Sequence, residues 1–328
     1  MKFSEFLGNE RIVSYFQRAI AGGHLGHAYI FSGPAGVGKT LLARLICKAL
    51  LCRQPTENGP CDVCAACHKF ESGNHPDFHS YVPDGLYFKI DLVQNIIHEA
   101  SMKPMEAHWK TFLLEGVDYM RDVPANAFLK VLEEPPGQTV FFLISEAVDT
   151  LLPTIRSRCQ QFAFQPIPLD LVKRWLVEKN ECTEEQAAAL APYSHGSLAR
   201  ALTLNTDQYR EMRERVLAVL EAASGAKTYA TLFDAAKSIT VDRSEMPERL
   251  QLIEEFIRDL LLLKSSAKAK LIHEDLRSRL GALASRWQPG VLQEFYENLL
   301  ETREAILKIN ANIGLQMQAL LLPVKLSS

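Results

Sequence analysis

The chain has 328 residues, of which 47% are hydrophobic and 23% are charged, and its formal net charge is −3. This length suits two or three domains, and the composition is that of an ordinary globular protein. The slightly negative charge excludes a protein that binds nucleic acid through a generally basic surface. The sequence has neither a run of about 18 apolar residues, as a membrane span requires, nor the apolar core of an N-terminal signal peptide. We therefore expect a cytoplasmic protein, whose seven cysteines favour a metal site or burial over disulfide bonds.

The first elements that the sequence predicts surround a glycine-rich motif. Residues 5–20 carry apolar side chains at the spacing of a helix, and residues 29–31 form a short apolar run typical of a buried strand. The motif G-x-x-x-x-G-K-[ST] follows this strand and precedes an amphipathic helix pattern, which is the context that the motif requires. In this chain the motif consists of Gly33, Pro34, Ala35, Gly36, Val37, Gly38, Lys39 and Thr40.

This motif predicts a phosphate-binding P-loop. Its glycines let backbone N–H groups surround a phosphate, and the helix N-terminus adds the positive end of its dipole. We expect Lys39 to reach the β- and γ-phosphates of ATP or ADP, and the Thr40 hydroxyl to bind Mg²⁺. The alternative, a chance glycine-rich turn, leaves the flanking strand and helix unexplained.

Four cysteines with the spacing C-x8-C-x2-C-x2-C come next. They are Cys52, Cys61, Cys64 and Cys67. Four thiolates at these separations can surround one Zn²⁺ as a tetrahedron, and a site without an open position is structural rather than catalytic. His68 is adjacent and could replace one cysteine, and a cluster of small buried cysteines without metal is the other alternative. The spacing favours a four-cysteine zinc module at about residues 52–67, inserted in the first domain.

Strand and helix patterns alternate as far as residue 165. In chain order, the predicted elements after the cysteines are strand 78–82, helix 90–100, strand 110–114, helix 126–134, strand 140–144 and strand 161–164. Together with strand 29–31, this alternation predicts a parallel sheet with helices on both faces.

Strand 110–114 ends where an active P-loop ATPase carries Asp-Glu. The Asp holds Mg²⁺ through water, and the Glu polarises the attacking water. Here these positions are Glu115 and Gly116. Glu115 can take the place of the Asp, but glycine has no side chain that could orient water. We therefore expect very weak or absent ATP hydrolysis by this chain, unless Glu115 or Asp118 acts in a rearranged site.

Strand patterns disappear after Pro168, and helix patterns dominate. Helices 169–179, 184–192 and 198–204 predict a small three-helix domain. A larger all-helical domain is predicted from helices 207–225, 229–239, 248–264, 271–283, 291–312 and 315–323. Within it, we expect a solvated helix face at Glu254, Glu255, Arg258 and Asp259.

Several stretches of this chain together resemble one family. They are HAYIFSGPAGVGKT, the cysteine cluster, NAFLKVLEEPP and LLPTIRSRC, in this order. In them the chain resembles the bacterial clamp-loader AAA+ subunits of DNA polymerase III. The resemblance implies an α/β P-loop (AAA+) domain with the zinc module at residues 1–166. It further implies a small helical lid domain at residues 167–206 and an all-α oligomerisation (collar) domain at residues 207–328.

Two departures make the chain more similar to the delta-prime branch of this family than to its gamma/tau motor subunits. The first is Gly116. The second concerns the motor subunits' Gly-Ser-Leu-Arg, whose arginine senses the γ-phosphate, because this chain has Ala199 there and the arginine is displaced to Arg200. A shift by one residue turns a helical side chain by about 100°. We therefore expect a subunit that is not itself a motor.

The resemblance also implies a role toward neighbouring subunits. Ser157, Arg158 and Cys159 match the family's Ser-Arg-Cys motif. This match implies that Arg158 is an arginine finger, which would enter the ATP site of an adjacent subunit and stabilise charge there. The implied partners are gamma/tau-like motors and a delta-like subunit in a hetero-oligomeric ring. Through that ring the chain would act on the sliding clamp and on primer-template DNA, as a stator in ATP-driven clamp loading.

Two alternative functions remain open. One is an active gamma/tau-like motor ATPase. The other is a zinc-containing DNA-binding ATPase of repair or recombination, whose cysteine module would contact DNA. The second is less well supported, because no basic and aromatic stretch surrounds the cysteines and Asp62 and Glu71 lie nearby.

Overall fold

The structure of the chain is a computed structural model that divides into two compact units, Met1–Leu202 and Thr203–Ser328. It describes residues 1–83, 87–179, 182–204, 207–225, 228–240, 242–243, 245–266, 268–307, 309 and 311–326. The expected domain boundaries after residues 166 and 206 stay a prediction. Among the described residues, no helix is both long enough and apolar enough to cross a membrane.

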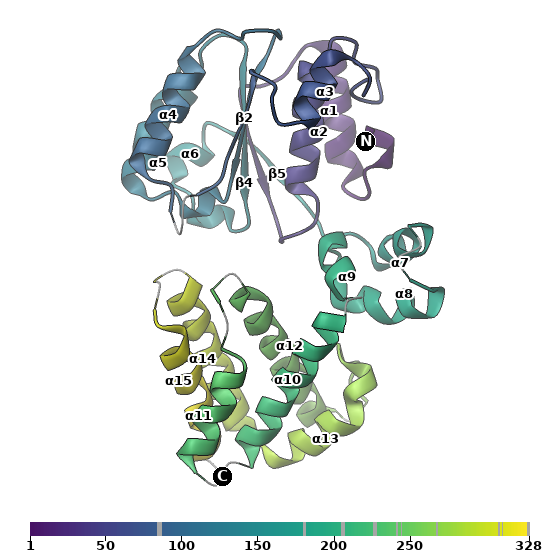
Figure 1. Ribbon diagram of the computed structural model, residues 1–328, viewed down its shortest axis with the longest axis vertical. Coiled ribbons are helices and arrows are strands. Elements are labelled where there is room, and N and C mark those ends of the chain that lie inside the picture. Colours follow the sequence, from purple (N-terminus) through teal and green to yellow (C-terminus); the bar gives the residue numbers. More distant parts are fainter. Residues whose placement is uncertain are drawn as a thin grey trace. The chain divides into compact units, whose positions relative to one another are not determined.

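The first unit is built on a five-stranded parallel sheet in the order β2-β3-β4-β1-β5 (Figure 1). The strands are β1 (Ala28–Ser32), β2 (Phe78–Tyr81), β3 (Lys110–Glu115), β4 (Thr139–Ser145) and β5 (Gln160–Ala163). The parallel sheet predicted from the sequence is thereby confirmed. All five strands are parallel, and the P-loop directly follows β1, which lies between β4 and β5. The P-loop therefore lies at the carboxyl edge of the sheet, where open α/β sheets bind their ligands.

Helices cover both faces of this sheet. Figure 1 shows α1, α2 and α3 on one face and α4, α5 and α6 on the other. Their bounds are α1 (Glu10–Gly22), α2 (Lys39–Leu51), α3 (Ala65–Glu71), α4 (Ile90–Ser101), α5 (Asp122–Glu133) and α6 (Pro153–Arg156). Helix α3, which is short and lies within the cysteine module, was not predicted from the sequence.

Aromatic side chains fill the core between α1, α2 and the sheet. Phe16 of α1 is fully buried. Its ring lies 4.9 Å from that of Tyr29 and 5.4 Å from that of Phe31, measured between centroids. Both contacts are edge-to-face, which is a favoured geometry for aromatic pairs. This packing fixes α1 against the strand that leads into the P-loop.

The helix expected over residues 5–20 begins later, at Glu10. Asn9 adopts the left-handed conformation, with φ of 54°, which asparagine tolerates better than most residues. Phe6 and Leu7 therefore lie outside α1, in the N-terminal segment that also contains a 3-10 turn at Phe3–Glu5. Their apolar character is explained by a pocket, described below, rather than by a helix face.

Asn9 also joins the beginning of α1 to the segment that follows β5. Its Oδ1 accepts a hydrogen bond of 2.8 Å from the backbone N–H of Gln165, and its Nδ2 donates one of 3.1 Å to the Gln165 carbonyl. The side-chain amide thus bonds to both the backbone N–H and the carbonyl of a residue 156 positions away.

The remainder of the first unit is helical. It consists of α7 (Leu169–Glu178), α8 (Glu184–Leu190), a 3-10 turn (Ala191–Ser194) and α9 (Leu198–Leu204), whose end passes the unit boundary. Residues between Ile167 and Ala201 form a hydrophobic cluster of their own, apart from those that pack on the sheet. The three helices predicted at residues 169–179, 184–192 and 198–204 are present, with the second one ending earlier, at Leu190.

The second unit is all-helical in its described residues. Its helices are α10 (Asp207–Ser224), α11 (Tyr229–Ser238), α12 (Met246–Ser265), α13 (Arg277–Arg286), α14 (Pro289–Leu307) and α15 (Ile313–Leu326). α12 contacts α10, α13 and α14, which is why its buried residues occupy more than one face.

The expected solvated face of α12 is wrong for two of its four residues. Asp259 is fully buried and Glu255 is only 4% exposed. The Asp259 carboxylate accepts backbone hydrogen bonds from Ile272 at 2.9 Å and from His273 at 2.7 Å. A buried carboxylate is tolerated when such donors satisfy it, and these donors lie in a distant segment that helical periodicity does not reveal.

Candidate functional site

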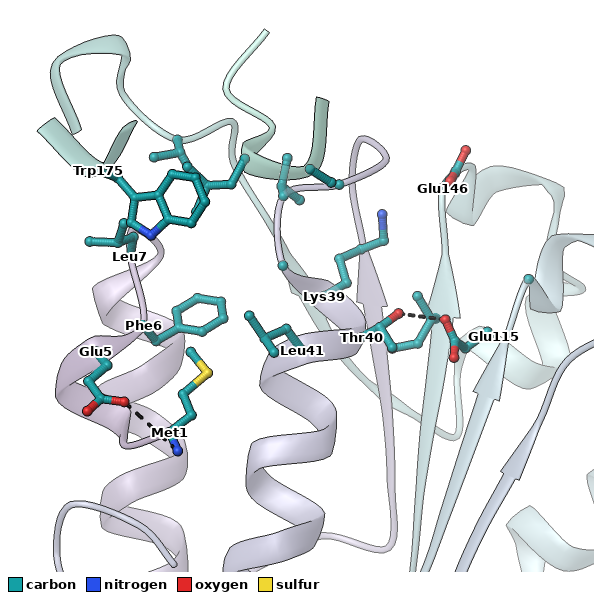
Figure 2. A pocket seen from close by; sticks show the side chains of 18 of the residues that line it. Met1, Glu5, Phe6, Leu7, Lys39, Thr40, Leu41, Glu115, Glu146 and Trp175 are labelled. Carbon is teal, nitrogen blue, oxygen red and sulfur yellow. Dashed lines mark hydrogen bonds and ion pairs between the residues drawn. The ribbon is translucent and has the colours of Figure 1, made fainter. Parts of the chain in front are cut away.

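A pocket of about 940 Å³ opens beside the P-loop and lies wholly within the first unit (Figure 2). Its wall includes P-loop residues 36–40 and the ends of β3 and β4. It also includes residues of the N-terminal segment, of α7 and of α9. A pocket of this size at the carboxyl edge of a parallel sheet is large enough to hold a nucleotide.

Lys39 lies at the beginning of α2 and is only 5% exposed. Its Nζ donates hydrogen bonds to the carbonyl oxygens of Gly33 at 2.6 Å and Pro34 at 2.7 Å. Burial lowers the pKa of Lys39, and the carboxylates of Glu146 and Asp118 oppose this shift. The ammonium group is thus held within the P-loop, next to the position where the motif would place phosphates.

Thr40 and Glu115 meet at the floor of the pocket. The Thr40 hydroxyl donates a hydrogen bond of 2.8 Å to Oε2 of Glu115 (Figure 2). Hydroxyl and carboxylate oxygens are ligands that Mg²⁺ prefers. The pair therefore fits a magnesium ion that arrives with a nucleotide, with Glu115 in the place usually taken by Asp.

Gly116 directly follows Glu115 and has a left-handed backbone, with φ of +67°. A Cβ at this position would lie 3.3 Å from the ring of Tyr119 and 3.4 Å from Pro83. Both the conformation and the close neighbours favour glycine over any residue with a carboxylate side chain. The geometry gives a local reason why a glycine follows Glu115.

Asp118 accepts hydrogen bonds from the segment at the end of β4. Its Oδ2 accepts a backbone hydrogen bond from Glu146 at 2.8 Å, and its Oδ1 accepts one from Ala147 at 3.2 Å. The hydroxyl of Ser145 also donates to this carboxylate. Asp118 therefore ties the turn after β3 to the end of β4, and both of its oxygens are engaged.

The small helical region closes one side of the P-loop. A Cβ at Gly36, whose φ is +72°, would lie 2.0 Å from the Ser197 hydroxyl oxygen, so only glycine allows this approach. Ala199 lines the pocket, whereas Nε of Arg200 donates a hydrogen bond of 2.7 Å to the Tyr193 carbonyl. This bond holds Arg200 to the turn before α9, and the expectation that Arg200 does not replace a γ-phosphate sensor stays a prediction.

Other residues of the pocket were not predicted as site residues from the sequence. Phe6, Leu7 and Trp175 line it (Figure 2), yet each was interpreted only as part of an apolar helix pattern. No motif marks them, because apolar pocket walls and apolar cores have the same composition.

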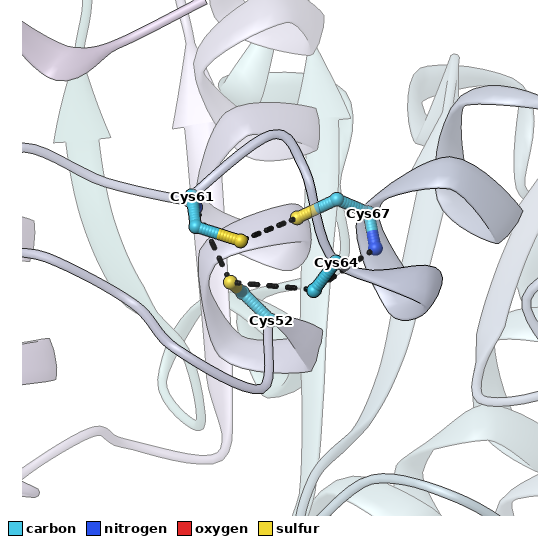
Figure 3. A group of neighbouring side chains, drawn as sticks. All are labelled: Cys52, Cys61, Cys64 and Cys67. Atoms are coloured by element: carbon cyan, nitrogen blue, oxygen red, sulfur yellow. Dashed lines mark hydrogen bonds between the residues drawn. The ribbon is translucent and has the colours of Figure 1, made fainter.

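The four cysteines come together as expected (Figure 3). Their Sγ atoms all lie within 4.8 Å of one another. Cys52 and Cys64 are separated by 3.9 Å between sulfurs, as are Cys61 and Cys67. A tetrahedron with Zn–S bonds of about 2.3 Å has sulfur separations of about 3.8 Å. The cluster can therefore bind a metal ion, and a shell of four thiolates suits Zn²⁺.

Backbone and charged groups support this cluster. The N–H groups of Gln54 and Cys61 donate to the Cys52 sulfur at 3.4 and 3.3 Å, and such bonds favour thiolates. Lys48 of α2 pairs with Asp62 and Glu71, which lie on either side of the last two cysteines. The module is thus fastened to α2, the helix that begins at the P-loop.

Arg158 lies between the end of α6 at Arg156 and the beginning of β5 at Gln160. Its side chain is 34% exposed, and its Nη2 lies 2.6 Å from Oε1 of Glu133. Its Nη1 donates a hydrogen bond of 2.9 Å to the Thr154 carbonyl. The guanidinium is therefore accessible at the surface and held by groups of the same unit.

Comparisons with known proteins identify the family. The family model "DNA polymerase III, delta subunit" matches residues 8–168, and "DNA polymerase III, delta subunit, C terminal" matches residues 208–325. The chain is 31% identical to DNA polymerase III subunit delta-prime of Bacillus subtilis, over 93% of this chain and 92% of that protein. The chain belongs to the delta-prime family of DNA polymerase III subunits. It is also 32% identical to the delta-prime subunit of Pseudomonas aeruginosa, over 90% of both chains.

Membership of the delta-prime family confirms the resemblance inferred from the motifs. A tau subunit of DNA polymerase III from Salmonella typhimurium is similar too, with 28% identity. That match covers 93% of this chain but only 51% of the tau subunit. The delta-prime relatives from Bacillus subtilis and Pseudomonas aeruginosa are instead covered over 92% and 90% of their own length.

Proposed function

We propose that this delta-prime chain is a stator of a cytoplasmic clamp-loader complex. In that complex, neighbouring gamma/tau-like subunits hydrolyse ATP, and the ring loads the sliding clamp onto primed DNA during replication. The chain contributes Arg158 to the ATP site of an adjacent subunit and hydrolyses little or no ATP itself. The domains that serve these roles are residues 1–166 (AAA+), 167–206 (lid) and 207–328 (collar), the last of which joins the ring.

The observation that carries this proposal is the contrast between two positions. Gly116 occupies the place of the water-orienting carboxylate, in a conformation that favours glycine. Arg158, in contrast, keeps a partly exposed guanidinium at the surface. A positive, planar group can stabilise the charge of a transferring phosphoryl group when a partner presents it. The chain is thus equipped to assist a reaction that its own pocket does not perform.

The pocket and the cysteines have supporting roles in this proposal. The P-loop residues 33–40 would bind ATP or ADP, with Mg²⁺ held by Thr40 and Glu115. Bound Mg²⁺ would offset the phosphate charge. The sulfurs of Cys52, Cys61, Cys64 and Cys67 would hold a structural Zn²⁺.

ATP turnover in a reconstituted clamp-loader complex tests the proposal. This chain would be supplied as wild type, as Arg158→Ala and as Lys39→Ala, with clamp and primed DNA present. We expect Arg158→Ala to reduce turnover sharply and Lys39→Ala to have little effect. Arg156→Ala is a matched control, because Arg156 lies two residues away and pairs with Asp149 at 2.8 Å.

The second candidate, an active motor ATPase, is favoured by the intact Lys39 and Thr40 and by Glu115, which can take the place of the usual Asp. It predicts the opposite result, in which Lys39→Ala is the damaging change. Appreciable ATP hydrolysis by the purified chain alone would also support it and contradict the stator.

A further inference from the structure

The N-terminal segment links the cysteine module to the nucleotide pocket. We call residues 2–7 the strap. At its first end, the strap lies on the turn formed by residues 56–59, which is part of the loop between the ligands Cys52 and Cys61. At its other end, Phe6 and Leu7 line the pocket beside the P-loop.

Asn58 holds the first end of the strap. Its Oδ1 accepts a hydrogen bond of 2.9 Å from the Ser4 N–H, and its Nδ2 donates one of 2.8 Å to the Ser4 hydroxyl. Its carbonyl accepts another of 3.1 Å from the Phe3 N–H. Lys2 adds a hydrogen bond to the Pro60 carbonyl and an ion pair of 3.5 Å with Asp62. The contacts are made with the segment between Cys52 and Cys64, so the position of that segment sets the position of the strap.

The strap itself is short and internally bonded. The Lys2 N–H donates to Oε2 of Glu5 at 2.8 Å, and the Phe6 N–H donates to the Phe3 carbonyl at 3.2 Å. Phe3 is 3% exposed and Phe6 is 8% exposed, so both rings are packed into the protein. A displacement at Ser4 is therefore passed on to Phe6 rather than absorbed by a loose chain.

Phe6 contacts the P-loop at the residue that caps α2. A Cβ at Gly38 would lie 2.8 Å from Cζ of Phe6, which shows how closely the ring approaches the backbone there. Gly38 precedes Lys39 and Thr40, whose backbone and side chains would surround the phosphates. The position of the ring therefore fixes one wall of the phosphate site.

The conformation of the turn at residues 56–59 depends on the cysteine cluster. Thr56 and Gly59 exchange backbone hydrogen bonds of 2.8 and 3.0 Å, and the base of the loop is closed by Cys52 and Cys61, both candidate ligands of one ion. A metal ion that holds both sulfurs restricts this loop, because it closes the chain at both ends.

We propose that the strap couples metal binding at the four cysteines to nucleotide binding at the P-loop, with Asn58 as the positioning residue. The inference rests on the proposed nucleotide binding by this chain. The metal-loaded module holds the strap, the strap holds Phe6 against Gly38, and the pocket is preorganised for a nucleotide. Loss of the metal or of the Asn58 side chain releases the same contact.

The test uses the full chain and a fluorescent ADP analogue with Mg²⁺. Zinc is removed by a chelator and then restored, and metal content is measured each time. We expect zinc removal to weaken ADP binding about tenfold, and Asn58→Ala to do the same in the zinc-loaded chain, as loss of one or two hydrogen bonds predicts. In Asn58→Ala, zinc removal should add little, because both changes break one connection.

Two variants sharpen this test. Asn58→Asp should bind ADP about as tightly as the wild-type chain, in contrast to Asn58→Ala. A carboxylate can accept hydrogen bonds from both the N–H and the hydroxyl of Ser4. Asn74→Ala is the matched control and should behave as wild type, because the Asn74 side chain bonds to Ser72 instead. If chelation unfolds the chain, the comparison of Asn58→Ala with Asn74→Ala in the zinc-loaded state still decides.

A second readout does not need nucleotide binding. Trp175 lines the same pocket as Leu7 (Figure 2), and replacing Trp109 and Trp287 by Phe makes it the sole tryptophan. Zinc removal should change its emission in the wild-type strap and not in Asn58→Ala. If this change occurs but no nucleotide binds, the structural link from the cysteines to the pocket is supported, whereas nucleotide binding by this chain, and with it the proposed coupling, is contradicted. If neither ADP affinity nor Trp175 emission responds to zinc or to Asn58→Ala, the coupling is wrong.

Discussion

The guanidinium of Arg158 and the carboxylate of Glu133 form an ion pair of 2.6 Å at the surface of the first unit. Both side chains are partly exposed, so water screens the pair and its net contribution to stability is small. This pair holds Arg158 in a defined orientation when no neighbour is present. A weak pair also suits the proposed role of Arg158, because an arginine finger for another subunit would have to leave its own subunit.

The first prediction concerns this pair. Glu133→Ala should change the free energy of unfolding by less than about 1 kcal/mol, the range of exposed ion pairs. In the reconstituted complex it should alter ATP turnover far less than Arg158→Ala does. Urea unfolding and steady-state turnover measure the two effects. An equal loss of turnover in both variants would show that Glu133 itself takes part in the reaction.

The second prediction concerns Asp77, which is fully buried. Its carboxylate accepts backbone hydrogen bonds from Met105, Glu106 and Ala107, at 2.6, 2.8 and 2.8 Å. Asp77→Asn places an amide donor opposite some of these donors and should destabilise the chain by about 2–3 kcal/mol at pH 7. Urea unfolding of both proteins measures this difference.

The difference should depend on pH in a defined direction. Burial alone would raise the pKa of Asp77, but the three N–H donors outweigh it and hold the pKa below its usual value. A lowered pKa stabilises the folded state above the ordinary value of about 3.9. The gap between wild type and Asp77→Asn should therefore be constant near neutrality and shrink as the pH falls below about 4. A gap that widens on acidification would contradict this assignment.

Asp259 provides a control of opposite sign. Burial raises its pKa despite the N–H donors of His273 and Ile272. Its contribution to stability is thus full below the ordinary carboxyl pKa and is lost as the pH rises through the raised one. Relative to Asp259→Asn, the wild-type chain should gain stability when the pH is lowered from 7 toward 4.

The third prediction concerns Gly116. Gly116→Ala should destabilise the chain by about 1–2 kcal/mol, because a side chain is strained in the left-handed region. Gly137→Ala is the matched control, since Gly137 has φ of +53° but open space around its Cβ. The difference between the two variants measures the crowding by Tyr119 and Pro83. Gly116→Glu should not create ATPase activity, and a large gain of turnover would show that the missing carboxylate alone silences the pocket.

The fourth prediction concerns the cysteines. The purified chain should contain one zinc per molecule, and Cys64→Ser should lose it and lower the thermal midpoint. Zinc binding should weaken on acidification, because the ligands must be thiolates. Metal analysis and thermal unfolding measure both effects. Cys182→Ser, outside the cluster, should retain the metal.

Local sequence patterns predicted most of the fold. Strands such as 140–144 are continuous apolar runs, which is the pattern expected for a strand that is buried on both faces of a parallel sheet. The P-loop and the cysteine module were also predictable, because backbone geometry and ligand spacing constrain these residues directly. Both are local properties of the chain.

The remaining features depend on contacts between distant segments. Phe6 was assigned to a helix, although it lines a pocket formed by residues as far away as Trp175. The helix pattern predicts Glu255 and Asp259 at a solvated face, but in the structure the segment near His273 covers them. The partner of Arg158 lies 25 positions earlier, at Glu133 (158 − 133), in a helix whose pattern gives no hint of the pairing.

The two hydrogen bonds between Asn9 and Gln165 have a consequence for the architecture of the first unit. They join the residue before α1 to the segment after β5, so the two ends of the α/β part lie next to each other. New termini could therefore be opened in an exposed turn, with a short linker between residues 9 and 165, and the sheet should still assemble. The same closure means that the strap and the helical region beyond β5 both leave the α/β part at one place, beside the P-loop.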